Sequence, residues 1–185
     1  MVEKPLFEDA WSRSKVRIFR LESLPVYNVP EDMKIFEEWK KTKKFSANSY
    51  EEWLQKLEKT KERGVVMQRV RVAQLPLSDY LKYEVDFWKN NSIKAGEQIS
   101  FIEKEKYQKL LEGLDFKQED FWMFDDKLVI IFHYSENGNL LNEELVTDPV
   151  LVNRHVQLKK ALLENSMDMT PFLYKVKHLN IANKS

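Results

Sequence analysis

Two pairs of charged residues stand two positions apart in segments that alternate like β-strands. Arg20 and Glu22 share one face of the first segment, because successive strand side chains point to opposite sides. Arg69 and Arg71 share one face of the second. If the two strands are neighbours, the four charges meet, and arginine forks suit phosphate and carboxylate groups. The pattern predicts an anion-binding surface; the alternative is a solvated sheet face with cross-strand ion pairs.

A second polar group lies at the start of the helix expected after Pro76. Asp79 and Tyr83 are four residues apart and can touch on one helix face. Tyr80 and Glu84 have the same spacing, and an acid beside a tyrosine hydroxyl can carry out acid–base chemistry. The alternative is an aspartate that favours the helix dipole, with tyrosines half-packed at the surface. We include these four side chains with the strand charges in the predicted ligand-binding or partner-binding site.

His133 is the histidine whose position suggests catalysis. It lies in an expected hairpin strand, eight residues after Asp125, and either Asp125 or Asp126 could orient it as a general base. Glu84 is the other candidate base, so the three catalytic candidates are His133, Asp125 and Glu84. His155 falls on an apolar helix stripe and is expected to be a buried structural histidine. No His-x-x-x-His spacing indicates a zinc pair, and no metal site is expected.

The segment from Lys40 to Lys44 places lysines beside Trp39 and Phe45. Basic and aromatic side chains together can bind single-stranded nucleic acid. A solvated helix C-terminus, where lysines complement the helix dipole, is the preferred interpretation. Nucleic-acid binding through these lysines is therefore a third, less favoured option.

Composition limits the class of protein. The 185 residues include 30 basic and 30 acidic side chains, so no global charge attracts nucleic acid or an anionic membrane. The absence of cysteine excludes disulfides, thiolate metal sites and cysteine nucleophiles. Neither a Walker-type loop nor a dinucleotide fingerprint is present, and we expect no cofactor. The N-terminus has no apolar signal region and no apolar run is long enough to span a bilayer, so we expect a cytoplasmic protein.

Helices and strands alternate along the chain in the elements that must position these residues. The expected strands are 16–22, 65–72, 98–102, 121–124, 127–134 and 140–146. Asn137-Gly138 predicts a hairpin, Asp148-Pro149 opens a helix, and Ser49 is expected to begin a capping box. We expect a single α+β domain over residues 1–185, with a largely antiparallel mixed sheet, packing helices and a C-terminal hairpin plus helix. Its core is expected over about residues 16–176, with a loose tail from Asn180.

Several segments carry a family resemblance as a set, although none is a chemical motif alone. They are Arg20-Leu21-Glu22, Tyr27-x-Val29-Pro30, Arg69-Val70-Arg71-Val72, Pro76 to Leu81 with Tyr83-Glu84, Ala95-Gly96-Glu97, Asp120 to Asp125, His133-Tyr134 with Gly138, and His155. Over about residues 16–175 the chain resembles a bacterial family of domains of unknown function, abundant in actinobacteria and often encoded beside helix-turn-helix regulators. The resemblance implies a cytoplasmic α+β domain that works with a DNA-binding regulator, and it supplies no known reaction.

Two hypotheses of function follow. The leading one is a non-enzymatic binding or regulatory module that acts with a protein partner, such as a helix-turn-helix regulator or a mobile-element or defence component. The alternative is a small enzyme that acts on a phosphorylated or nucleotide-like ligand. In that enzyme the arginines would hold the anion, His133 or Glu84 would act as the base, and Asp125 would orient the base.

Overall fold

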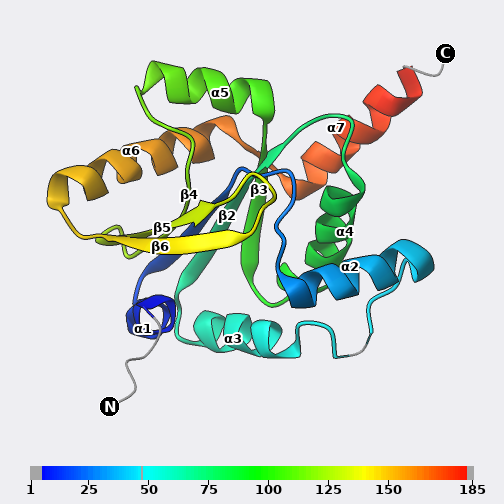
Figure 1. The fold of residues 1–185 in the computed structure, drawn as a ribbon, viewed down its shortest axis with the longest axis horizontal. Helices are drawn as coiled ribbons and strands as arrows, with labels where there is room; N and C mark the ends of the chain where they lie inside the picture. Colours follow the sequence, from blue (N-terminus) through cyan, green and yellow to red (C-terminus); the bar gives the residue numbers. More distant parts are fainter. Residues whose placement is uncertain (1–5, 47, 183–185) are drawn as a thin grey trace.

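The computed structural model describes residues 6–46 and 48–182. Within these residues, seven strands form one sheet in the order β6-β5-β4-β1-β2-β3-β7 (Figure 1). The strands are β1 Arg17–Glu22, β2 Val66–Ala73, β3 Glu97–Glu103, β4 Asp120–Phe124, β5 Leu128–Tyr134, β6 Leu140–Val146 and β7 Met167–Asp168. The β1–β2 and β2–β3 pairs are parallel, and the other described pairs are antiparallel. The expected α+β fold with a largely antiparallel mixed sheet is confirmed.

Helices cover both faces of the sheet (Figure 1). They are α1 Leu6–Arg13, α2 Pro30–Thr42, α3 Glu51–Glu62, α4 Asp79–Phe87, α5 Lys104–Gly113, α6 Pro149–Asn165 and α7 Met169–Ala182, with a π-helical turn η1 at Trp88–Ser92. The parallel strand pairs require crossover connections, which α2 with α3 supply between β1 and β2, and α4 with η1 supplies between β2 and β3. These crossovers place α2, α3 and α4 over one face of the central strands.

Alternate residues of the central strands divide between the two faces. Phe19, Leu21 and Phe121 pack beneath α5 and α6, and we call this side the apolar face. Ile18 and Trp122 point to the other side, where α1 and α3 pack. That second side also carries the side chains of Arg20, Glu22, Arg69, Arg71, Glu97 and Asp120, and we call it the charged face. Both faces of the central strands are therefore covered by helices.

The start of α6 has the side-chain cap that the sequence indicates, and the start of α4 is capped by Ser78. The Asp148 side chain accepts the backbone N–H groups of residues 150 and 151, each at 3.0 Å. Ser78 accepts the N–H of residue 81 at 3.1 Å. The capping box predicted at Ser49 is wrong, because the residue before α3 is Tyr50, with φ of 63°. The Ser49 hydroxyl instead hydrogen-bonds Ser46 at 2.8 Å.

The ordered structure extends beyond the expected core at both ends. α1 precedes residue 16, and its Trp11 ring lies 5.3 Å from Trp53 and 5.5 Å from Trp122, between ring centroids. α7 continues to Ala182, so the tail expected from Asn180 is helical up to that residue, and 183–185 lie outside the described residues. None of the described helices is long and apolar enough to cross a membrane.

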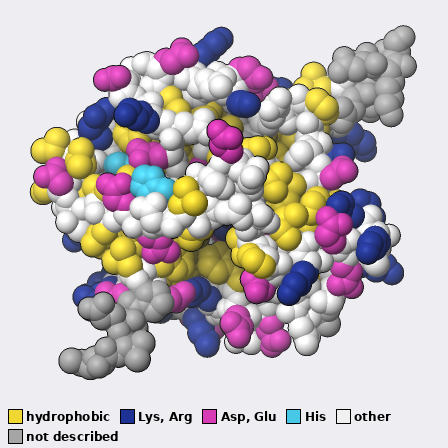
Figure 2. All heavy atoms as spheres, in the orientation of Figure 1, with side chains coloured by type: hydrophobic (Ala, Val, Ile, Leu, Met, Phe, Trp, Pro, Cys, Tyr) yellow, Lys and Arg dark blue, Asp and Glu magenta, His cyan; other side chains and the backbone are white. Residues whose placement is uncertain are grey.

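The outer surface has a mixed chemistry. Figure 2 shows acidic and basic side chains interspersed over one side of the molecule, in line with the formal net charge of +0. Apolar side chains gather at the left of this view, where β6 leads into α6. Val150 and Leu151 at the start of α6 are 70% and 47% exposed.

Candidate functional site

The two charged strands are neighbours, as the site prediction requires. β1 and β2 pair in parallel, with Arg20 opposite Arg69 and Glu22 opposite Arg71. The face is not solvated, however, because Arg20, Arg69 and Arg71 are only 3%, 7% and 1% exposed. The predicted anion-binding surface and its alternative, a solvated face, both placed these charges in water. Helices cover the charges, so the solvation that both interpretations assumed is wrong. The cross-strand ion pairs of the alternative are confirmed, because Arg69 pairs with Glu22 of β1 and Glu97 of β3.

Arg69 joins two carboxylates at the centre of the charged face. Its Nε donates to Oε1 of Glu97 at 2.7 Å, and its Nη1 donates to Oε2 of Glu22 at 2.6 Å. Burial by itself would raise the pKa of Glu22, but the charges of Arg69, Arg20 and Arg71 outweigh burial and lower that pKa to about 2. Glu22 is therefore ionised at neutral pH and anchors the network.

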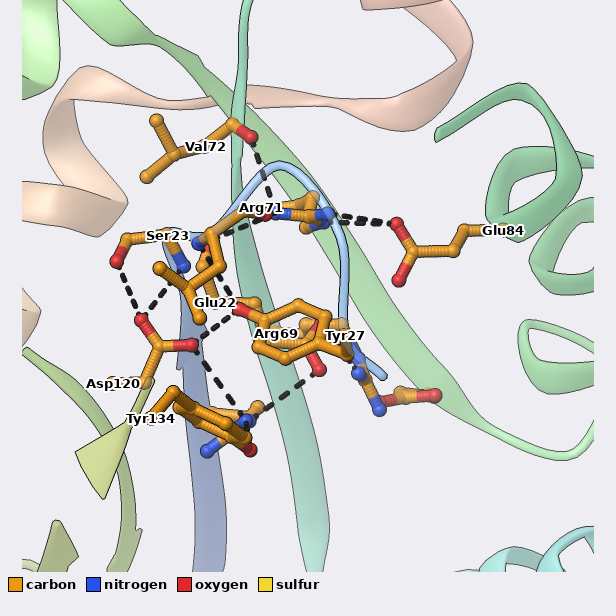
Figure 3. A network of polar contacts seen from close by, with 12 residues as sticks. Glu22, Ser23, Tyr27, Arg69, Arg71, Val72, Glu84, Asp120 and Tyr134 are labelled. Atoms are coloured by element: carbon orange, nitrogen blue, oxygen red, sulfur yellow. Dashed lines mark hydrogen bonds and ion pairs between the residues drawn. The ribbon is translucent and has the colours of Figure 1, made fainter. Parts of the chain in front are cut away.

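Arg71 makes a further ion pair of the network, with Glu84 (Figure 3). Its Nε and Nη2 both donate to Oε2 of Glu84, at 3.0 Å and 2.9 Å, and its Nη1 donates to the carbonyl of Leu24 at 2.5 Å. Burial raises the pKa of Glu84 to about 7, although the nearby Arg71 opposes the rise. Glu84 can therefore exchange a proton near neutral pH.

Asp120 closes the network on the side of β4 (Figure 3). Its carboxylate accepts the N–H and the hydroxyl of Ser23 at 2.9 Å and 2.5 Å, and it also accepts the hydroxyl of Tyr27. Arg20 Nη2 lies 3.8 Å from Asp120 and donates to the hydroxyl of Tyr134 at 3.2 Å. Arg20 Nη1 is buried and has no hydrogen-bond partner among the described residues. One guanidinium donor of this network is therefore unused.

A cavity of about 320 Å³ lies over the charged face, between the sheet and the helices. Its helical side is lined by Tyr50, Trp53, Tyr80, Tyr83, Phe87 and Trp88. Its other aromatic walls are Trp122 and Tyr134 from the sheet and Tyr27 from the loop before α2. Ligand pockets start at about 300 Å³ and are mostly apolar with a few placed polar groups. The dimensions and lining of this cavity match that description.

Arginine side chains cover the innermost rings of the cavity. The Arg20 guanidinium carbon lies 5.1 Å from the ring centroid of Trp122, and that of Arg69 lies 5.3 Å from Trp88. Trp88 is in position because the chain leaves α4 through the π-helical turn η1, and such turns are frequent at functional sites. Cation–π contacts therefore fix the floor of the cavity.

The predicted hairpin turn also holds one wall of the cavity. Asn28 donates its backbone N–H to the carbonyl of Gly138 at 2.9 Å. A Cβ atom at Gly138, whose φ is +78°, would lie 2.4 Å from the carbonyl oxygen of Val26, so only glycine fits. The tip of the β5–β6 hairpin thus packs closely against the loop that carries Tyr27. The Tyr27 and Tyr134 ring centroids are 5.2 Å apart.

Three of the four predicted helix residues line the cavity. Tyr80, Tyr83 and Glu84 do so, whereas Asp79 is exposed and pairs with Lys82 at 2.9 Å. The Asp79–Tyr83 contact expected from helix spacing is replaced by that ion pair, which leaves Asp79 outside the cavity. The structure therefore brings together Arg20, Glu22, Arg69, Arg71, Tyr80, Tyr83 and Glu84 on or behind one cavity.

The three catalytic candidates are not brought together. His133 points to the opposite side of the sheet from the cavity, as do the other odd-numbered residues of β5, and its Nε2 lies 2.8 Å from Oε2 of Glu144. Asp125 lies in the β4–β5 turn, where it accepts the N–H groups of residues 15–17 at 2.8 to 2.9 Å. Five strand positions separate the start of β5 from His133, a span of about 17 Å. The predicted Arg/His/Asp cleft is therefore not formed, and only Glu84 lines the cavity.

The lysine segment from Lys40 to Lys44 lies outside the cavity. Its aromatic neighbour Trp39 is 5% exposed and donates its indole N–H to Asp86 at 2.8 Å. The Lys43 ammonium group lies 4.0 Å from the Trp39 ring centroid. Trp39 is therefore packed into the protein rather than presented for stacking on a base.

Some participants in the site were not among the predicted site residues. Tyr27, Asp32 and Tyr50 line the cavity, and Glu97 and Asp120 bind its arginines. The alternation of Asp120 with Trp122 and Phe124 in β4 was an available signal for the face on which Asp120 lies. The pairing of Glu97 with Arg69 depends on the register of β3 against β2, which local sequence patterns do not reveal. Among the described residues, no three His, Asp or Glu side chains form a group that could hold a metal ion.

Comparison with known proteins identifies the family. The family model described as a domain of unknown function, DUF6879, matches residues 5–174. The chain belongs to the DUF6879 family. No curated protein matches the sequence of this DUF6879 domain.

Solved structures give only a distant likeness to the DUF6879 domain. One is described as the structure of TrmBL2, an archaeal chromatin protein that shows a novel mode of DNA binding. It is 12% identical with a TM-score of 0.45, and the match covers 86% of this chain and 48% of that one. The chain thus spans about half the length of that protein.

Proposed function

We propose that this DUF6879 domain is a non-enzymatic binding module that holds a compact organic ligand in its aromatic cavity. The carrying observation is a cavity of about 320 Å³ that is lined by aromatic rings and has the buried side chains of Arg20, Glu22 and Arg69 at its floor. Ion pairs within the chain hold these charged groups in place, so they are fixed polar groups beside the hollow. Aromatic walls around a few fixed polar groups are the usual construction of a ligand pocket.

The arrangement of the charges favours binding over reaction. Arg69 and Arg71 are held by carboxylates of the same chain, which keeps the floor of the cavity rigid. The candidate base His133 and its expected partner Asp125 lie away from the cavity. A preorganised polar floor lowers the cost of ordering side chains when a ligand binds.

Acid–base catalysis by Glu84 is a second candidate, supported by a specific observation. Its pKa of about 7 suits proton transfer at neutral pH, and its side chain lines the cavity. Both hydrogen bonds from Arg71 reach the same oxygen, Oε2. Turnover of a bound ligand by the wild type, abolished in Glu84→Gln while binding persists, would replace the non-enzymatic proposal with this one.

We extend the proposal to a protein partner that senses whether the cavity is occupied, with a helix-turn-helix regulator as the candidate. Its support in the structure is the edge strand β6, where Leu141 and Leu145 are 66% and 45% exposed. An exposed edge with apolar side chains is a template for association with another chain. A partner captured by the wild type and lost in Leu141→Lys supports this extension, and equal capture by both contradicts it.

Ligand-observed NMR with a library of fragment-sized compounds tests the binding proposal. The blocking variant is Val29→Trp, since Val29 lines the cavity, is 39% exposed and makes no side-chain hydrogen bond. The matched control is Val150→Trp, on the outer surface at the start of α6. We expect compounds that bind the wild type and Val150→Trp but not Val29→Trp. Fragments that bind all three proteins equally, or none, would contradict a ligand cavity here.

A further inference from the structure

We infer that the ligand is a compact organic cation, with its positive group between Asp32 and the tyrosines of α4 and its polar end at Arg20. This inference rests on the proposed binding function and names the ligand class. It also reverses the expectation, drawn from the arginines alone, that the site binds a phosphate or another anion.

The charges around the cavity show an excess of carboxyl groups. Three arginines take part, at positions 20, 69 and 71, each already beside at least one carboxylate. The carboxyl groups are Glu22, Asp32, Glu84, Glu97 and Asp120. Carboxyl groups thus outnumber guanidinium groups, although burial raises the pKa of four of them and only Glu22 has a lowered pKa. Each guanidinium group is already paired with a carboxylate of the chain, so the arginines offer an added anion no unpaired charge, whereas the Asp32 side chain makes no ion pair in the described structure.

The positive and negative groups occupy different sides of the cavity. Arg20 and Arg69 stand on the sheet, with Glu22 between them. Asp32 on α2 and Glu84 on α4 stand on the helical side, and Arg71 contacts Glu84 from behind. The positive group of a ligand is therefore placed at the helical side, and the polar end of the same ligand faces Arg20 on the sheet side.

The aromatic rings reinforce this polarity. The inner rings of Trp88, Trp122 and Tyr27 already face guanidinium groups at 5.3, 5.1 and 5.3 Å from their centroids. No such cation contact is present in the described structure for Tyr50 or Tyr83, which lie on the helical side beside Asp32. Aromatic rings with a nearby carboxylate are the usual cage for ammonium groups.

Burial is the main cause of the raised pKa values on the helical side of the cavity, and nearby carboxylates add to it. Burial raises the pKa of Asp32 above its ordinary value. Burial, followed by the charge of Asp32, raises the pKa of Tyr50 far above its ordinary range. Burial, followed by the charges of Glu84, Asp32 and Glu22, does the same for Tyr80. The tyrosines therefore remain neutral, and their rings are available as uncharged aromatic walls beside Asp32.

Three probes of nearly the same shape isolate the effect of charge. Choline carries a trimethylammonium group and a hydroxyl, 3,3-dimethylbutan-1-ol is its uncharged analogue, and 3,3-dimethylbutanoate is an anion of similar bulk. Isothermal titration calorimetry at pH 8, where Glu84 is ionised, measures their affinities for the full chain. We expect choline to bind at least tenfold more tightly than the alcohol, and the butanoate to bind most weakly.

Two aspartate variants locate the positive group. Asp32→Asn keeps the size of the side chain, so we expect choline affinity to fall at least fivefold while affinity for the alcohol is unchanged. Asp79→Asn is the matched control, because Asp79 lies nearby on α4 but outside the cavity, and it should bind choline like the wild type. Circular dichroism and thermal unfolding establish that both variants are folded, and Val29→Trp should exclude choline without removing any charge.

The outcomes separate this inference from the binding proposal. Equal or tighter binding of the alcohol or the butanoate, blocked by Val29→Trp, overturns the cationic ligand and leaves the cavity as a binding site. Choline binding that is insensitive to Asp32→Asn overturns the assigned position of the positive group. If none of the three probes binds at millimolar concentration, the inference is rejected, and the fragment screen decides the binding proposal independently.

Discussion

The two faces of the sheet are built from alternate residues of the same strands and have opposite chemistry. On the apolar face Phe19, Leu21 and Phe121 are fully buried among hydrocarbon side chains. On the charged face Arg20 and Arg69 are also buried, and a cavity of about 320 Å³ lies over them. Neighbouring positions of one strand therefore point to two different environments. One is a packed apolar core, and the other is a polar surface beneath a cavity.

Stability of the fold alone does not explain why charged side chains are buried on this face. Replacement of a buried ion pair by well-packed apolar residues is often neutral or stabilising, because desolvation offsets the attraction between the charges. The proposed ligand site supplies a reason other than stability to keep a buried polar network beneath a cavity. The following changes test the contrast between the two faces.

Removal of a single central arginine should have the largest effect. Arg69→Ala leaves Glu22 and Glu97 buried without their shared partner, so we expect a loss of about 3–5 kcal/mol in the free energy of unfolding. Urea unfolding at pH 7 measures this loss. On the apolar face, Phe121→Ala should cost about the same, through a cavity rather than an unpaired charge. A loss below about 1 kcal/mol for Arg69→Ala would show that the network is not energetically coupled.

The pH dependence of stability should distinguish Glu84 from the apolar face. The groups that influence its pKa are Arg71, Glu22 and Arg69, and its folded pKa of about 7 exceeds the ordinary value of 4.5. The unfolded chain therefore releases this proton first, and wild-type stability falls as pH rises from 4.5 through about 7. The Glu84→Gln variant has no carboxyl group at this position, so its stability should not show this fall with rising pH.

Equilibrium unfolding of both proteins at several pH values checks this prediction. Between about pH 5 and pH 8, the free energy of unfolding of Glu84→Gln should rise relative to that of the wild type by on the order of 2 kcal/mol. Two parallel pH profiles would contradict the raised pKa. Phe121→Leu on the apolar face serves as the control, since its difference from the wild type should not depend on pH.

Conversion of an ion pair into an apolar contact should cost less than the removal of one partner. Arg71→Met combined with Glu84→Leu replaces both charges with side chains of similar bulk. We expect the double variant to lie within about 2 kcal/mol of the wild type and to be more stable than Arg71→Met alone. Thermal and urea unfolding of the two single variants and the double variant give the coupling energy. A double variant that is less stable than the wild type by much more than about 2 kcal/mol would mean that the pair contributes net stability.

The exposed end of the hairpin should show the smallest effect. His133 pairs with Glu144 at 2.8 Å, but their side chains are 40% and 55% exposed, so solvent screens the interaction. We expect His133→Ala to change the free energy of unfolding by less than about 0.5 kcal/mol and to leave fragment binding intact. Loss of ligand binding in this variant would restore His133 as a site residue.

Local patterns predicted much of the fold. Alternation located β1 and β2, and the Asn137-Gly138 turn located the β5–β6 hairpin to the residue. The same alternation placed Arg20 and Arg69 on one face. What it did not reveal is burial, because an alternating charged strand has the same pattern whether water or a helix covers it. Packing of α2 and α4 over the charges is a long-range property.

The partners of the charges also depend on long-range structure. Glu97 reaches Arg69 through strand register, and Asp120 reaches Tyr27 across 93 positions of the chain. His133 was expected near Asp125 because their strands are adjacent. Their separation follows from the direction of β5, which carries His133 away from the turn that holds Asp125.

The most direct test of a ligand cavity on the charged face is a crystal structure with a heavy-atom cation. Crystals soaked in (2-bromoethyl)trimethylammonium would show the bromine by anomalous scattering. We predict an anomalous peak inside the cavity, with the trimethylammonium group between Asp32 and Tyr83, and no such peak in crystals of Val29→Trp. A cavity filled only by ordered water, with bromine elsewhere or absent, would contradict a cation-binding site on this face.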